Sequence, residues 1–185
     1  MLLRRAAAAS AALVLMLAAH PLIAQSSNSV LLGAGLSVPA GDLAVYANNG
    51  WDITAGLEHR FGRGPVGVRL DFSYAVNSDT TGLGFHESTA LITGMANIVY
   101  HFQGSRPHLY ALLGVGYFGR RFSTDDPDDE AINDSRFAFQ VGEGLTFRVG
   151  SATLFIEGRF VSGTGEDPLR FFPVVIGVRF GGPKQ

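Results

Sequence analysis

The chain has 185 residues, a length that suits a single domain. It contains 24 glycines and no cysteine, which excludes disulfide scaffolds, thiol nucleophiles, cysteine-ligated metal sites and a lipoprotein anchor on cysteine. The formal net charge is -2 and no basic block is longer than Arg120-Arg121, so we expect no binding to nucleic acid.

The first residues, 1–25, have the composition of a secretory signal peptide. Arg4 and Arg5 give a positive start, an apolar stretch covers Ala6–Ala19, and the small Ala24 precedes the expected cut. The apolar stretch is too short for a typical spanning helix, although an uncleaved anchor is the alternative. We therefore expect residues 1–25 to be removed and residues 26–185 to form one domain.

Beyond residue 25, apolar and polar residues alternate in eight runs, which is typical of strands with two unlike faces. Most runs exceed the ~5–6 residues of an ordinary strand, and they match the ~9–11 residues that cross a bilayer at a tilt. Short and long connections alternate, as in a meander closed into a membrane barrel. The expected strands are Ser29–Val38, Trp51–Phe61, Pro65–Val76, Thr89–Phe102, His108–Phe122, Arg136–Val149, Ala152–Val161 and Arg170–Gly181.

One face of these strands is aliphatic in the middle and aromatic at the ends. Two aromatic girdles around an aliphatic band are expected where rings lie at the level of lipid headgroups. The alternative is that aromatic residues are merely common in strands. We interpret this face as a lipid-facing wall, with girdles that include Trp51, Phe61, Tyr74, Phe102, Tyr117, Phe147, Phe160 and Phe180.

The other face carries glycines and charged residues. The interior of an eight-stranded barrel is just wide enough for side chains, and charges in so narrow a space need partners. We interpret the charges as a structural salt-bridge network that plugs the lumen, and a polar pore or site is the alternative. The network is expected to include Glu58, Arg60, Arg69, Asp71, Arg148, Glu157, Arg159 and Arg179.

Two residues break the alternation, because His59 and Glu143 fall on the apolar face. His59 lies near a rim, where exposure costs little. Glu143 lies nearer the middle, where an ionised group is costly. Either a bulge shifts the alternation locally at Glu143 or the carboxylate meets a partner, and we expect the bulge.

Several short motifs follow one another in a fixed order over nearly the whole chain beyond residue 25. They are VLLGAGL at 30–36, Gly50-Trp51, GVRLD at 67–71, ANIVYHF at 96–102, LLGVGY at 112–117, FIEGRF at 155–160 and IGVRF at 176–180. Together they resemble the small outer-membrane β-barrel proteins of the OmpA/OmpX type from Gram-negative bacteria. The resemblance implies an all-β fold, an eight-stranded antiparallel up-and-down transmembrane β-barrel, with both termini in the periplasm.

The same resemblance implies insertion by the barrel assembly machinery, which reads a terminal aromatic residue in the last strand. Phe180 fits that role, but the tail Gly181–Gln185 places it away from the chain end. The expected surroundings are outer-membrane lipid and lipopolysaccharide, and we expect a monomer.

Candidate chemistry is sparse. The cluster His86-Glu87-Ser88 lies in an expected loop. In a strand-like triplet neighbouring side chains alternate between faces, so Glu87 would point away from His86 and Ser88, and we predict no catalytic residues. The acidic segment 125–130, with Asp134, lacks the ligand spacing of an EF-hand loop; it is either solvated or binds divalent cations. The histidines show no metal-ligand spacing, so we expect neither a metal nor a cofactor.

We therefore expect a non-enzymatic outer-membrane barrel with a structural or surface-interaction role. Two alternatives remain open. One is a lipid A-modifying barrel enzyme, and the other is a soluble lipocalin-like barrel that binds an apolar ligand inside. Partner contacts are expected on four surface loops, Pro39–Gly50, Ser78–Ser88, Ser123–Ser135 and Ser162–Leu169.

Overall fold

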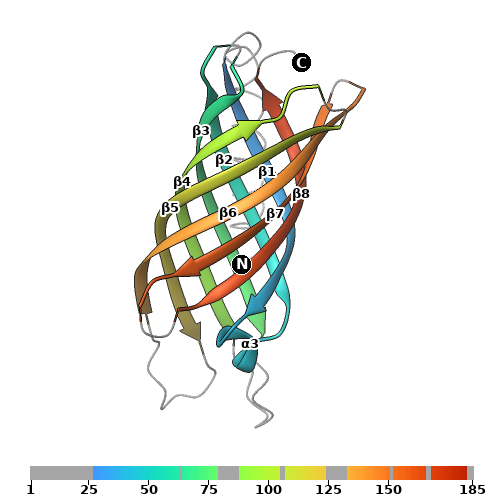
Figure 1. The fold of residues 1–185 in the computed structure, drawn as a ribbon. Helices are drawn as coiled ribbons and strands as arrows, with labels where there is room; N and C mark the ends of the chain where they lie inside the picture. Colours follow the sequence, from blue (N-terminus) through green and yellow to red (C-terminus); the bar gives the residue numbers. More distant parts are fainter. Residues whose placement is uncertain are drawn as a thin grey trace, which may run out of the picture.

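The computed structural model shows a closed antiparallel barrel of eight strands (Figure 1). Each strand pairs with its neighbour in the sequence, and β8 pairs with β1 to close the sheet. The predicted fold class is therefore confirmed. The structure describes residues 27–62, 64–78, 88–104, 107–123, 133–150, 152–165 and 168–182.

Every predicted run coincides with a strand to within a few residues, and a four-residue helix in the first long connection is the element that the periodicity did not predict. No described helix has the length and apolar character needed to span a membrane. The elements are β1 (Asn28–Ala40), α3 (Leu43–Tyr46), β2 (Gly50–Arg60), β3 (Val66–Ser78), β4 (Ser88–His101), β5 (His108–Ser123), β6 (Asn133–Val149), β7 (Ala152–Gly163) and β8 (Arg170–Gly181).

The outer wall of the barrel is apolar. Along β2, Ile53 and Leu57 are about half exposed, at 49% and 55%, whereas Thr54 and Glu58 between and beyond them are buried. The same alternation continues on the other strands, because successive side chains of a strand point to opposite faces. A continuous apolar wall of this size is unusual for a protein surrounded by water.

Glu143 does not lie at a bulge, so this expectation was wrong. The register around it is unbroken, with Ala111 of β5 on one side and Gly158 of β7 on the other. The Glu143 side chain is exposed on the outer wall, between Val141 and Leu145 on the same strand. Both cross-strand neighbours have little or no side chain, which leaves the carboxylate room to reach past the wall.

Apolar side chains cluster in the half of the lumen nearest α3. Phe118 and Phe171 lie 5.9 Å apart between ring centroids, and Leu43 of α3 is buried against the same group. The expectation of a small or charged inner face was therefore incomplete. Several inward positions near this end are apolar because they pack on one another and on α3, and they lie beside buried polar side chains such as Ser37 and Asn77. The cluster contains Leu43, Ala47, Ala75, Leu91, Met95, Phe118, Ala138, Val161, Leu169 and Phe171.

Candidate functional site: the charged lumen

Arg69 on β3 is the centre of the polar half of the lumen. Its side chain is almost fully buried, and its guanidinium group contacts two carboxylates. Nε donates to Oδ2 of Asp71 at 2.9 Å, and Nη2 donates to Oε1 of Glu157 at 2.9 Å. Nη1 also lies 2.7 Å from Oε2 of Glu157, so the pair has the two-point geometry that a planar guanidinium favours.

Glu157 on β7 receives two further groups. The hydroxyl of Tyr110 on β5 donates to its Oε2 at 2.7 Å, and Nε of Arg159 lies 3.3 Å from its Oε1. The Tyr110 ring also lies 5.8 Å from the guanidinium carbon of Arg69. Glu157 is thus held from three strands, which fixes its position in the lumen.

An amide chain continues the network from Asp71. Nδ2 of Asn97 on β4 donates to Oδ2 of Asp71 at 2.9 Å, and Nε2 of Gln140 on β6 donates to Oδ1 of Asn97. All three side chains are buried. Buried polar groups are costly unless they are hydrogen-bonded, and this chain satisfies several of them at once.

A second cluster lies toward the end of the barrel with the short connections. Glu58 on β2 contacts both Nη2 of Arg179 on β8 and Nε2 of His101 on β4, the latter at 2.9 Å. Nη2 of Arg179 also donates to the hydroxyl of Ser29 on β1 at 2.7 Å. This cluster therefore links four strands, including the pair that closes the barrel.

Glycines provide the space that these large side chains occupy. A Cβ atom on Gly144 of β6 would overlap the ring of Tyr110, and one on Gly56 of β2 would lie 2.6 Å from Oδ1 of Asp71. Neither position could carry a side chain without moving a member of the network. The many inward glycines are thus part of how the network fits an eight-stranded barrel.

The structure brings together six of the eight charged residues expected in the lumen. Arg60 is only half-buried at the end of β2, and Arg148 is exposed at the end of β6, apart from the others. Arg148 lies next to the short connection between β6 and β7, where the side chain reaches beyond the lumen. The six that come together are Glu58, Arg69, Asp71, Glu157, Arg159 and Arg179.

Sequence reasoning missed two partners in the network. Tyr110 and His101 point inward, and the alternation along β5 and β4 could have placed them there. Asp52 on β2 was also missed; it is fully buried, with one oxygen 3.7 Å from Nη2 of Arg159. The alternation of residue types shows on which side of the barrel wall a side chain lies, but it does not show which side chain it meets across the lumen.

The expected girdle aromatics all lie on the outer wall. At the α3 end, Trp51 lies 5.7 Å from Tyr74 between ring centroids, and Phe160 lies 4.9 Å from Phe172. At the opposite end, Phe102 packs edge-on against Tyr100 at 5.1 Å. At the α3 end the rings that meet come from neighbouring strands, whereas Tyr100 and Phe102 at the opposite end are two positions apart in one segment.

Several expectations fall on residues outside the described ranges. These are the signal peptide at 1–25, the pair His86-Glu87, and the acidic segment at 125–130. Among the residues that the structure describes, no group of three or more His, Asp or Glu side chains could hold a metal ion.

Comparisons with solved structures find the same fold in other barrels. Neisserial surface protein A is 17% identical, with a TM-score of 0.59 over 83% of this chain and 96% of that one. Ail, the attachment invasion locus protein of Yersinia pestis, is 19% identical, with a TM-score of 0.55 over 83% and 97%. A major outer membrane protein from Thermus thermophilus is 16% identical, with a TM-score of 0.52 over 83% and 98%.

No curated protein matches the sequence. A family model does: the outer membrane protein beta-barrel domain matches residues 9–160. The match covers most of the chain, and the apolar outer wall and aromatic ends described above agree with it. The chain therefore belongs to the outer membrane protein β-barrel domain family, and its place is the outer membrane of a Gram-negative bacterium.

Proposed function

We propose that this protein is a structural and surface-interacting barrel with a plugged lumen and no catalytic activity. The observation that carries the proposal is the position of Arg69. Its side chain extends from β3 to Glu157 on β7, on another wall of the barrel, and both side chains are buried. A guanidinium group that contacts Glu157 through two nitrogen atoms across the lumen obstructs the path that a solute would take.

The two ends of the lumen support the same proposal. Leu43 and the apolar cluster fill the α3 end, while Glu58, His101 and Arg179 fill the opposite end. The charged groups contact one another, so they are engaged in the packing of the barrel. A catalytic site would instead need a nucleophile or an acid–base pair that a substrate can reach.

The surface role rests on the long connections, which lie at the end of the barrel that carries α3. In the orientation that we propose, this end is extracellular and the chain ends of the barrel are periplasmic. Val45 on α3 is 69% exposed beside the buried Leu43, so the helix presents an apolar side chain at the mouth. One neighbour, Ail, is known in complex with the heparin analogue sucrose octasulfate, which is a precedent for ligand binding in this fold.

Conductance in planar lipid bilayers tests the plugged lumen. The refolded wild-type chain is expected to show no stable channel, whereas Arg69→Ala together with Glu157→Ala is expected to raise conductance by opening space in the lumen. Arg148→Ala is the matched control, because Arg148 is an exposed arginine outside the network. Steady ion conduction by the wild-type barrel would contradict the proposal.

Absence of catalysis has its own test. Mass spectrometry of lipid A from cells with and without the gene is expected to give identical acylation patterns. A changed pattern that depends on the gene would identify a lipid A-modifying enzyme instead.

Biogenesis completes the proposal, in which the barrel assembly machinery inserts the chain as a monomer. Phe180 is the last outward aromatic of β8. Phe180→Ala is expected to lower the amount of folded barrel in cells, while refolding of the purified variant in detergent stays close to that of the wild type. Equal losses in both assays would point to a packing role for Phe180.

A further inference from the structure

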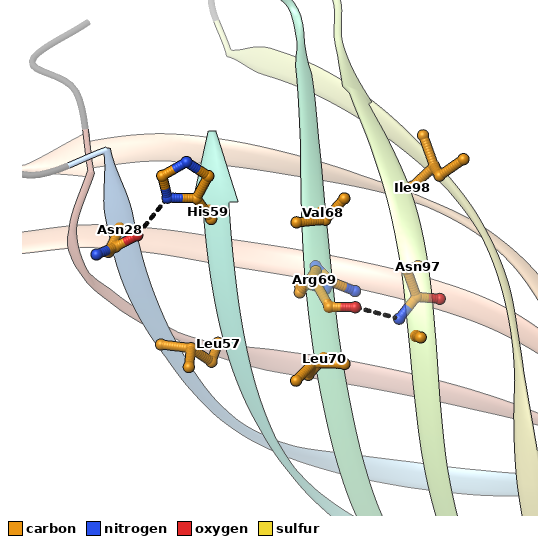
Figure 2. A pocket seen from close by; sticks show the side chains of 9 residues that line it. Asn28, Leu57, His59, Val68, Arg69, Leu70, Asn97 and Ile98 are labelled. Atoms are coloured by element: carbon orange, nitrogen blue, oxygen red, sulfur yellow. Dashed lines mark hydrogen bonds between the residues drawn. The ribbon is translucent and has the colours of Figure 1, made fainter. Parts of the chain in front are cut away.

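The outer wall has a groove that the proposed function does not use. It has a volume of about 510 Å³ and crosses β2, β3 and β4, with Asn28 of β1 at one end (Figure 2). This volume falls within the ~300–1,000 Å³ of small-molecule sites. The side chains that line its outer part are Leu57, His59, Val68, Leu70, Ala96 and Ile98.

The shortest outward side chain in the lining of the groove is that of Ala96. Ala96 on β4 lies between Leu70 of β3 and Val115 of β5 in the cross-strand register, and all three face outward. The methyl group of Ala96 lies between two larger side chains, so the wall is lower there. Ile98, the next outward residue on β4, borders the same hollow.

The groove runs obliquely from one end of the barrel toward the middle of the band. His59 lies two positions from Phe61, a girdle residue at the short-connection end, while Ala96 is separated from the girdle residue Phe102 by both Ile98 and Tyr100. One end of the groove is therefore at headgroup depth, and the other end is at the depth of acyl chains.

The headgroup end is polar. Nδ1 of His59 lies 2.6 Å from Oδ1 of Asn28, and because that oxygen is an acceptor, Nδ1 carries the proton. Nε2 is then the ring atom left to meet a ligand. The imidazole is also fixed by the ring of Phe61, at 5.3 Å in an edge-on arrangement. Figure 2 shows His59 and Asn28 together at one end, with Leu57, Leu70 and Ile98 beyond them.

We propose that this groove is a specific site for one phospholipid of the periplasmic leaflet. The polar headgroup meets Nε2 of His59, and one acyl chain lies across Val68 and Leu70 toward Ala96. The polar and apolar ends follow the same order as the head and tail of a lipid in that leaflet. The inference depends on the outer-membrane location and not on whether the lumen is plugged.

Native mass spectrometry of the full chain, released from detergent, tests the site with dioleoyl phosphatidylethanolamine as the probe. The wild type is expected to keep one lipid molecule. Ala96→Leu fills the hollow and is expected to weaken retention at least fivefold. Ala55→Leu is the matched control: Ala55 faces outward on β2 but does not line the groove, so retention should stay within twofold of the wild type.

The headgroup contact has a separate readout. Preference for dioleoyl phosphatidylethanolamine over dioleoylglycerol, which lacks the phosphate-containing headgroup, is expected to fall at least fivefold in His59→Ala and less in His59→Gln, whose amide can still form a hydrogen bond. Migration on gels before and after boiling checks that each variant is folded. Equal loss in Ala96→Leu and Ala55→Leu, or equal retention of both lipids by the wild type, would overturn the proposal and leave only unspecific contact with the bilayer.

Discussion

Arg69 and Glu157 are 88 positions apart in the sequence, yet their side chains meet through two contacts of 2.9 and 2.7 Å inside the barrel. They belong to β3 and β7, which are not neighbours in the sheet. The pair therefore connects walls that share no backbone hydrogen bonds, and it acts as a brace across the lumen.

Removing one member of this pair is expected to destabilise the barrel strongly. Arg69→Met leaves the buried carboxylates of Asp71 and Glu157 without their main cation, and breaking a buried pair typically costs ~3–5 kcal/mol. Urea unfolding in lipid vesicles measures the change. The double variant Arg69→Met with Glu157→Met should cost less than the sum of the single changes, and strict additivity would show that the two residues do not interact.

Gly144→Ala is expected to destabilise the barrel by ~1–3 kcal/mol, because the new methyl group overlaps the ring of Tyr110 and overpacking has about this cost. Thermal or urea unfolding in the same lipid measures the effect. Gly158→Ala is the matched control on the outer wall, where a Cβ atom meets nothing within 4 Å. The expectation fails if both variants are as stable as the wild type.

Glu143→Leu is expected to stabilise the membrane-inserted barrel by about 1 kcal/mol. A charged residue on the lipid face is unfavourable by up to ~2–4 kcal/mol for Lys and Arg at the midplane, and by less for Glu. Glu143 lies between Val141 and Leu145 in the band, so leucine completes the apolar wall. Leu145→Ile is a control for a change that leaves polarity untouched. Loss of stability in Glu143→Leu would mean that the carboxylate has a favourable contact in the membrane.

Brominated phospholipids are expected to quench the fluorescence of Trp51, the one tryptophan in the sequence. Its side chain is 48% exposed on the outer wall, next to Tyr74 in the girdle at the α3 end. Bromines near the headgroup should quench more than bromines at the chain ends. Efficient quenching by aqueous iodide with none by the lipids would mean that this wall faces water.

Alternation of residue types was enough to predict the strands and their two faces. Side chains along a strand alternate between its two faces, so placing one residue on a face also places every other residue of the strand. On β2, for example, Ile53 lies outside and Glu58 lies inside. The helix α3 was not predictable in this way, because four residues are too few for a helical period to become visible.

The partners inside the lumen were beyond the reach of this reasoning. Alternation placed Arg69 and Glu157 inside, but which charges meet depends on the stagger of the strands, which no single run records. The expectation of a bulge at Glu143 was wrong for another reason. The bulge was inferred from the cost of a charge on the apolar face, whereas the strand keeps its register and the carboxylate remains outside.

The contact between Glu58 and Arg179 has a consequence for assembly. Glu58 comes from β2 and Arg179 from β8, the last strand to be synthesised. Until β8 docks on β1, the carboxylate lacks this counter-ion and has only its contact with His101 in the open sheet. The ion pair that buries this charge therefore forms only when β8 pairs with β1 and closes the barrel. A chain that lacks β8 should stall at the membrane surface.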